Sequence, residues 1–97
     1  TLYQVIMGST GASVCLSQWE NSILAGDFEP GFALALAAKD IRLATDLGRM
    51  HGIPMEVSNL SDQKFTEAMA SGLGEEVASS VARLQEKRTG IQLRFTA

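Results

Sequence analysis

Glycine and proline residues interrupt this sequence at intervals that suit helices, and these breaks constrain its fold more than any other feature. They are Gly8, Gly11, Gly26, Pro30, Gly31, Gly52, Pro54, Gly72, Gly74 and Gly90. Between the breaks, apolar residues recur every three or four positions, which is the period of a helix that buries one face. The pattern predicts helices over residues 2–7, 13–25, 32–51, 58–71 and 76–88. Only residues 91–95 have weak strand character. We therefore expect an all-α fold, a helical bundle of about five helices.

Length and composition exclude several classes of protein. The 97 residues are enough for one domain, and a hydrophobic fraction of 45% allows a modest core. The net charge of -3, with no basic run, argues against nucleic acid as a partner. No apolar run approaches the roughly 20 residues that a membrane helix needs. The single cysteine, Cys15, excludes an internal disulfide, so we expect a cytoplasmic protein.

The sequence offers no catalytic or metal-binding set of its own. One histidine, His51, and one cysteine cannot make a metal site, and Cys15 is expected to be a small buried apolar residue. The glycine-rich run at residues 8–13 lacks both a preceding strand and the lysine of a phosphate loop. It is interpreted as a connection between helices.

The predicted helix over residues 32–51 is the most informative segment. On a helical wheel, one face carries Phe32, Leu36, Leu43, Leu47 and Met50. Smaller residues widen this apolar arc, so the helix is expected to be central and packed on several sides. Asp40 falls inside the arc and Lys39 on its border. A carboxylate in a core needs partners, so Asp40 is interpreted as a structural anchor, with orientation of a group at a cleft as the alternative. Lys39 is either a solvated lysine or a functional one.

An ordered series of short motifs resembles one enzyme family. It comprises Gly26-Asp27-Phe28-Glu29-Pro30-Gly31-Phe32, Leu34, Leu36, Lys39-Asp40, Leu43-Ala44, Gly52-Ile53-Pro54, Phe65, Ala68, Gly72 and Gly74. In this order and spacing, the series is similar to the β-hydroxyacid dehydrogenases, which include 3-hydroxyisobutyrate dehydrogenase and tartronate semialdehyde reductase.

The resemblance implies that residues 1–97 are the helical C-terminal domain of a two-domain oxidoreductase. This domain would be similar to that of phosphogluconate dehydrogenase, would close the cleft and would mediate homo-oligomerisation. An upstream Rossmann domain would bind NAD or NADP. The full enzyme would transfer a hydride between nicotinamide and a small 3-hydroxy acid or semialdehyde. The chain alone is expected to be inactive, and Thr1 in place of an initiator Met suggests a fragment.

The same resemblance assigns a cofactor-binding role to three residues. Lys39 matches the lysine that contacts the dinucleotide, while Phe28 and Phe32 would line the cleft. The family's catalytic lysine and substrate-carboxylate motif would lie upstream of Thr1, so no catalytic residue is assigned here. The chain has no G-x-G-x-x-G motif, and it carries Val77 where the family often has Asp. A non-catalytic helical dimerisation module remains the alternative.

Overall fold

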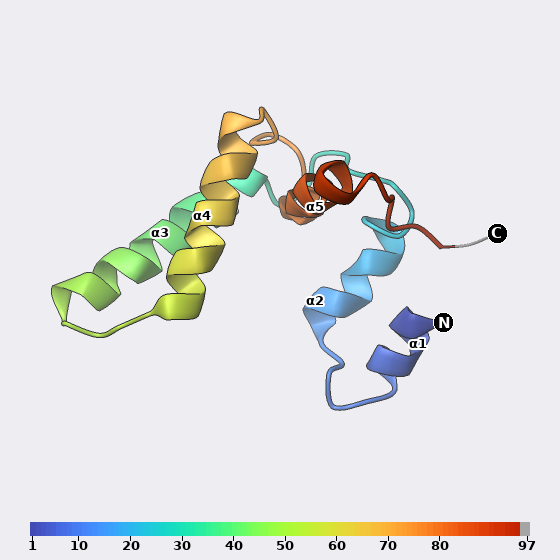
Figure 1. The fold of residues 1–97 in the computed structure, drawn as a ribbon, viewed down its shortest axis with the longest axis horizontal. Helices are drawn as coiled ribbons and strands as arrows, with labels where there is room; N and C mark the ends of the chain where they lie inside the picture. The colour runs from blue at the N-terminus through green and yellow to red at the C-terminus, as the bar shows by residue number, and fades with distance from the viewer. Residues whose placement is uncertain (96–97) are drawn as a thin grey trace.

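A computed structural model describes residues 1–95, and helices account for its regular structure (Figure 1). The elements are α1 (Leu2–Met7), α2 (Val14–Ser17), the 3-10 turn η1 (Gln18–Asn21), α3 (Leu34–Met50), α4 (Glu56–Ala70), the 3-10 turn η2 (Ala78–Val81) and α5 (Ala82–Thr89). Residues 1–95 contain no strand, and the one β-bridge there joins Ala33 to Val77. The all-α prediction is confirmed. Within the same range, no helix is both long and apolar enough to span a membrane.

The second predicted helix is shorter than its sequence pattern suggests. Its start is as expected, because the Ser13 side chain accepts a hydrogen bond from the Leu16 backbone N–H at 2.9 Å. After Ser17 the chain tightens into η1, and the prediction of a helix to residue 25 is wrong. The Ser17 hydroxyl donates to the Val14 carbonyl at 2.6 Å, and such local bonds compete with a regular helix.

Helices α3 and α4 run alongside each other and form one arm of the molecule (Figure 1). They meet through small or buried residues, which are Leu34, Ala38, Thr45 and Gly48 of α3 and Ala68 of α4. The large apolar residues of α3 lie elsewhere: Phe32, Leu36, Leu43, Leu47 and Met50 are 47–78% exposed. The prediction that α3 is packed on several sides is therefore wrong for this chain by itself. Small side chains let the two helix backbones approach closely. The α3–α4 contact therefore lies on a face of α3 adjacent to the one that carries the large apolar residues.

Asp40 also lies outside the core that the sequence pattern predicts for it. Its side chain is 58% exposed, and its carboxylate lies 3.1 Å from the Lys39 ammonium. The apolar arc around Asp40 is itself solvent-facing, so the carboxylate needs no buried partner. Its predicted role as a structural anchor is not seen.

The base of the arm is fastened by backbone hydrogen bonds between distant segments. Leu34 N–H donates to the Glu76 carbonyl at 2.8 Å, Ala35 N–H to Gly74 at 2.9 Å, and Ala78 N–H to Phe32 at 2.8 Å. These bonds tie the turn at residues 74–76 and the extended Val77 to the start of α3, so the last helical segment begins at Ala78 rather than at residue 76. Glu76 lies before this segment and pairs with Arg83 at 2.6 Å. Lys87 and Arg88 occupy the last turn of α5.

The tail after Gly90 folds back onto the start of the chain. The weak strand prediction for residues 91–95 is wrong, but Phe95 N–H donates to the Leu24 carbonyl at 2.9 Å. The Phe95 ring packs against Tyr3, with centroids 5.9 Å apart. Loss of hydration and the nearby Glu20 raise the pKa of the Tyr3 hydroxyl above its ordinary value of 10.0.

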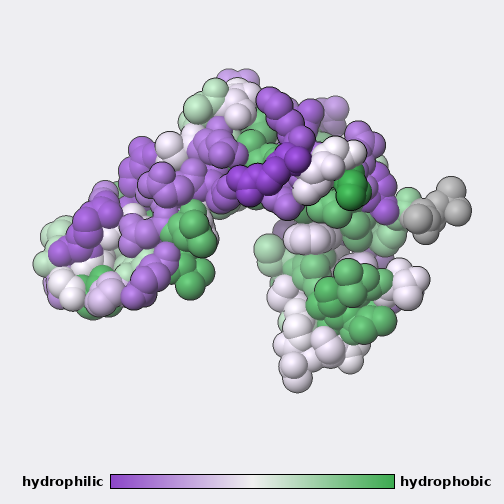
Figure 2. Space-filling model, in the orientation of Figure 1, coloured by the Kyte–Doolittle hydropathy of each residue, from purple (hydrophilic) through white to green (hydrophobic). Residues whose placement is uncertain are grey.

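The helices form an arch rather than a bundle closed around one core (Figure 1). The α3–α4 arm is one limb, and α1, α2 and η1 form the other. Helix α5 with η2 connects the two limbs. Figure 2 shows apolar side chains on both limbs beside the concavity beneath the arch. A large part of the apolar surface is thus left unburied by these residues.

Candidate functional site

The structure places the three predicted cofactor-binding residues at three separate surfaces. Lys39 borders a groove between α3 and α4, Phe28 lies in a cavity beneath α5, and Phe32 faces the hollow under the arch. Within residues 1–95, the three side chains therefore do not line a common pocket.

The Lys39 groove has a volume of about 310 Å³. Its other lining residues are Ala35, Ala38, Arg42, Leu43, Asp46, Thr66 and Met69. The Lys39 side chain is 59% exposed, and its ammonium pairs with the carboxylate of its neighbour Asp40. An exposed pair of this kind is worth only about 0–1 kcal/mol, so it does not prevent the ammonium from binding another anion.

Arg42 adds a second cation one turn along from Lys39. Its Nε lies 4.0 Å from Asp62, which is a long and loose pairing, and its side chain is 57% exposed. Arg49 is paired with Asp46 and is not free in the same way. The groove thus presents Lys39 and Arg42 beside apolar residues, and its one carboxylate, Asp46, is already paired with Arg49. This arrangement suits an anionic ligand with an apolar part.

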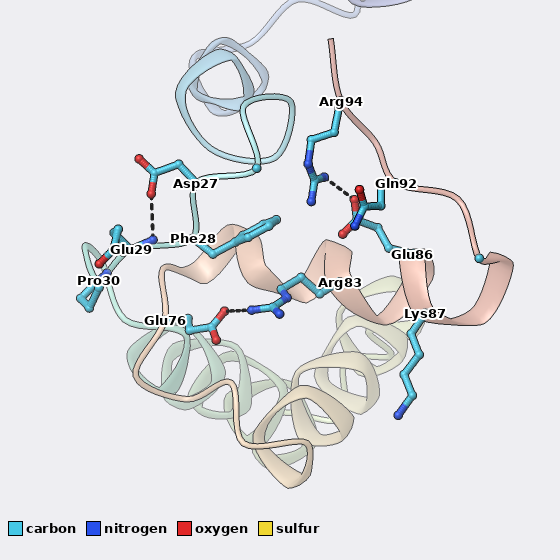
Figure 3. A pocket seen from close by; sticks show the side chains of 12 residues that line it. Asp27, Phe28, Glu29, Pro30, Glu76, Arg83, Glu86, Lys87, Gln92 and Arg94 are labelled. Carbon is cyan, nitrogen blue, oxygen red and sulfur yellow. Dashed lines mark hydrogen bonds and ion pairs between the residues drawn. The ribbon is translucent and has the colours of Figure 1, made fainter. Parts of the chain in front are cut away.

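Phe28 is held between two guanidinium groups. The Cζ atoms of Arg83 and Arg94 lie 5.2 Å and 5.5 Å from the ring centroid, and Figure 3 shows the ring between them. Each arginine is itself paired, Arg83 with Glu76 at 2.6 Å and Arg94 with Glu86 at 2.5 Å. The half-buried ring is therefore fixed by cation–π contacts on both faces.

The Phe28 cavity is poorly suited to phosphate. It encloses about 780 Å³ and is lined by four carboxylates (Asp27, Glu29, Glu76 and Glu86) and three cations (Arg83, Lys87 and Arg94). Both arginines are already paired with carboxylates, and Figure 3 shows Lys87 extending away from the ring. Among the predicted residues, Lys39 has the surroundings that best fit an anionic cofactor.

Arg94 is the residue of this region that sequence reasoning missed. Its Nη1 donates to Glu86, to the Leu93 carbonyl at 2.8 Å and to the Ile23 carbonyl at 3.1 Å. These bonds join the tail to the loop that carries Phe28. No pattern in the sequence links residues so far apart, so only the folded chain reveals the contact.

Phe32 lies at an apolar hollow of about 680 Å³ between the limbs of the arch, and its side chain is 55% exposed. Cys15 is also exposed and lines this hollow, so the expectation that it is buried is wrong. In the part of the chain that the structure describes, no three His, Cys, Asp or Glu side chains gather as a metal site would require.

Comparisons with known proteins identify one family of dehydrogenases. Residues 1–85 match a family model described as "NAD-binding of NADP-dependent 3-hydroxyisobutyrate dehydrogenase". The match covers Phe28, Phe32 and Lys39 but ends before Arg94.

Curated relatives are named as dehydrogenases or reductases. The chain is 34% identical to 2-(hydroxymethyl)glutarate dehydrogenase from Eubacterium barkeri over 96% of this chain and 31% of that protein. It is 32% identical to 3-sulfolactaldehyde reductase from Escherichia coli (strain K12), over 67% of this chain and 22% of the reductase. It is also 32% identical to L-threonate dehydrogenase from Cupriavidus necator, over 86% of this chain and 28% of that enzyme. The chain thus spans less than a third of the length of these relatives.

Proposed function

The chain belongs to the family of NADP-dependent 3-hydroxyisobutyrate dehydrogenases, in the region described as NAD-binding, and we propose that it is their helical C-terminal domain. The absence of strands from residues 1–95 supports this position. A Rossmann domain needs a parallel sheet and a glycine-rich first turn. The sheet would then belong to the rest of the polypeptide. The likeness to the C-terminal domain of phosphogluconate dehydrogenase is part of the same proposal.

The full protein would be an NAD(P)-dependent oxidoreductase acting on a small 3-hydroxy acid or semialdehyde. The names of the relatives support this class, because they refer to 2-(hydroxymethyl)glutarate, 3-sulfolactaldehyde and L-threonate. When bound, NAD(P) supplies or accepts the hydride. These 97 residues, lacking the sheet, would be inactive by themselves.

The contribution of this chain would be to bind and orient the cofactor through the Lys39 groove. The exposed Lys39 ammonium can donate hydrogen bonds to ribose or phosphate oxygens, and Arg42 adds positive charge beside it. The small residues Ala35 and Ala38 leave room for a ligand to approach α3. Phe28 and Phe32, on the two other surfaces, remain predicted contacts. The observation that carries this proposal is an available lysine at a groove within the matched region.

Replacing Lys39 in the full-length protein tests the assignment. Lys39→Ala should raise the NAD(P) dissociation constant by roughly 10-fold or more, because a hydrogen bond to a charged group contributes about 1.5–3 kcal/mol. Isothermal titration calorimetry measures this, and Lys39→Arg should restore part of the affinity. Lys64→Ala is the matched control, since Lys64 lies on α4 and lines neither the Lys39 groove nor the Phe28 cavity. An unchanged dissociation constant for Lys39→Ala would reject the cofactor role.

The alternative is a non-catalytic helical dimerisation module. The exposed apolar residues Leu36, Leu43 and Leu47 of α3 favour it, since they offer a surface for another copy. Homo-oligomerisation is also compatible with the enzyme, so the two proposals differ only in cofactor binding. An oligomer that dissociates on Leu43→Glu, together with unchanged cofactor affinity in Lys39→Ala, would favour the module.

A further inference from the structure

The loop between the N-terminal limb and α3 carries two of the predicted cofactor contacts, Phe28 and Phe32. This Phe28 loop comprises residues 26–33 (Figure 1). Backbone hydrogen bonds secure its ends, at 2.9 Å to the segment that precedes it and at 2.8 Å to η2. Within residues 1–95, however, residues 28–31 make no backbone–backbone hydrogen bond with any other segment. The middle of the Phe28 loop therefore depends on side-chain contacts for its position.

Arg94 reaches the Phe28 loop from the other end of the chain. Its Nη1 donates to the Ile23 carbonyl at 3.1 Å, shortly before the loop begins, and its Cζ lies 5.5 Å from the centroid of the Phe28 ring (Figure 3). The guanidinium also lies so close to the Gly26 backbone that a methyl group there would be 2.6 Å from Nε. One side chain thus contacts both the entry of the loop and the ring at its middle.

Arg94 is itself fixed by α5 and by the tail. The Glu86 carboxylate, which is 10% exposed, accepts hydrogen bonds from Arg94 at 2.5 Å and from the Leu93 N–H at 2.7 Å. The next residue of the tail is secured as well, because Phe95 N–H donates to the Leu24 carbonyl. A charge-assisted hydrogen bond with little exposure to water is stronger than an exposed ion pair. Arg94 therefore gives the loop a rigid support.

The opposite face of the ring has a weaker support. Arg83 lies 5.2 Å from the Phe28 centroid, and its ion pair with Glu76 is more exposed, with side chains 45% and 31% accessible. Solvent weakens such a pair. The Glu76 carbonyl also accepts the hydrogen bond of Leu34 N–H, the first residue of α3. The ring is thus held between the start of α3 and the tail, and Arg94 is the firmer of its two cationic contacts.

We propose that Arg94 is a positioning residue for cofactor binding, because it fixes through the Phe28 ring the loop that presents Phe28 and Phe32 to the cleft. Without it, residues 28–31 would take other positions, and ordering them again on binding would lower the affinity. The inference rests on the proposed function, since the position of this loop matters only if the cleft binds NAD(P). The family model matches residues 1–85, so that match assigns no role to Arg94.

Cofactor affinity of the full-length protein tests this role. Isothermal titration calorimetry uses NADH or NADPH, whichever the unmodified protein binds more tightly. Arg94→Ala should raise the dissociation constant by roughly 5-fold or more, the effect expected when a partly desolvated cation–π contact is lost. Arg94→Lys should restore most of the affinity, because an ammonium can still pair with Glu86 and approach the ring. Arg88→Ala is the matched control, since Arg88 is exposed on α5 and does not line the Phe28 cavity.

A second pair of variants keeps the test valid if Arg94→Ala folds poorly with Glu86 left unpaired. Arg94→Gln combined with Glu86→Gln replaces the ion pair by neutral side chains and should weaken binding as Arg94→Ala does. A smaller folded fraction would lower the stoichiometry of the titration and leave the dissociation constant unchanged. That result, or an unchanged dissociation constant at full stoichiometry, would overturn the proposal.

A double-mutant cycle with Phe28 separates positioning through the ring from a general structural effect of the tail. In a Phe28→Leu background the ring is absent, so Arg94→Ala should change the dissociation constant by less than about 2-fold. If Arg94 only stabilised the tail, the same substitution would weaken binding by an equal factor in both backgrounds. Equal factors would overturn the proposal.

Lys39→Ala, measured alongside, separates failure of this proposal from failure of the proposed function. Weaker binding in Lys39→Ala with no change in Arg94→Ala would overturn the role of Arg94 alone. No change in either variant would overturn the proposed function and, with it, the role of Arg94. Weaker binding in Arg94→Ala alone would support the positioning role and reject the cofactor role of Lys39.

Discussion

At Gly26, backbone conformation and space both require the absence of a side chain. Its φ is +71°, in the left-handed region, and a methyl group there would lie 2.6 Å from Arg94 Nε. Arg94 cannot move away easily, because its guanidinium is bonded to Glu86 and to the Ile23 carbonyl. This glycine therefore supports the loop that carries Phe28.

Gly26→Ala is expected to destabilise the protein by about 1–3 kcal/mol, the usual cost of forcing a residue with a Cβ into this conformation. The free energy of unfolding from urea titration measures the effect. Gly31→Ala, in the same loop, is the control, because its φ is not positive and the new methyl would meet Val77 at an ordinary 3.5 Å. Equal losses in the two variants would contradict the explanation.

At the residue scale, the sequence indicated the surroundings of some side chains and not of others. Lys39 was located by its place in the motif series, and its exposure beside a groove agrees with availability for binding. Asp40 was misplaced because a helical wheel shows which residues share a face but not whether that face is covered. The cation–π contacts of Phe28 with Arg83 and Arg94 depend on how distant segments fold together, which a local pattern does not contain.

At the scale of elements, the glycine and proline breaks predicted where helices end more accurately than where they begin. Helix α1 has the predicted bounds, and α3 and α4 each end within a residue of the expected position, before Gly52 and Gly72. The start of the last helical segment moved because residues 74–78 bond to the start of α3. Termination by glycine is a local property, whereas a start can be displaced by pairing with a remote segment.

The N-cap of α2 should contribute a large share of that helix's stability, because α2 is only four residues long. Ser13→Ala removes the hydrogen bond accepted from the Leu16 N–H and should lower the free energy of unfolding by about 0.5–2 kcal/mol. Thermal denaturation followed by circular dichroism measures the loss. Ser17→Ala in the same helix is the control, because it removes only a bond to the Val14 carbonyl and should have a smaller effect. A larger loss in the control would argue against the cap.

For the whole molecule, the sequence predicted helices but not the arch. Its apolar stripes are real, yet many of their large members face outward, as Leu43 and Leu47 do at 58% and 56% exposure. Periodicity assigns an apolar face to each helix and assumes that its partner lies within the sequence. Where the partner lies elsewhere, the same pattern is compatible with an open shape.

Expressed alone, the 97-residue chain is expected to self-associate, because its apolar faces are left uncovered. Light scattering should show species larger than a monomer, with size increasing with concentration. Leu43→Glu combined with Leu47→Glu should reduce the association, whereas Lys87→Glu on α5 serves as a control for added charge alone. A monomer at all concentrations would count against this expectation.

The hydrogen bonds at the base of the α3–α4 arm also have a consequence for the order of folding. They join residues far apart in the chain, such as Leu34 and Glu76, and closing so long a loop in an unfolded chain is entropically unfavourable. The α3–α4 hairpin brings both ends of that loop together through contacts closer in sequence. Formation of the hairpin should therefore precede the pairing of Ala33 with Val77. Docking of α5 and the tail against the N-terminal limb would then be a late event in folding.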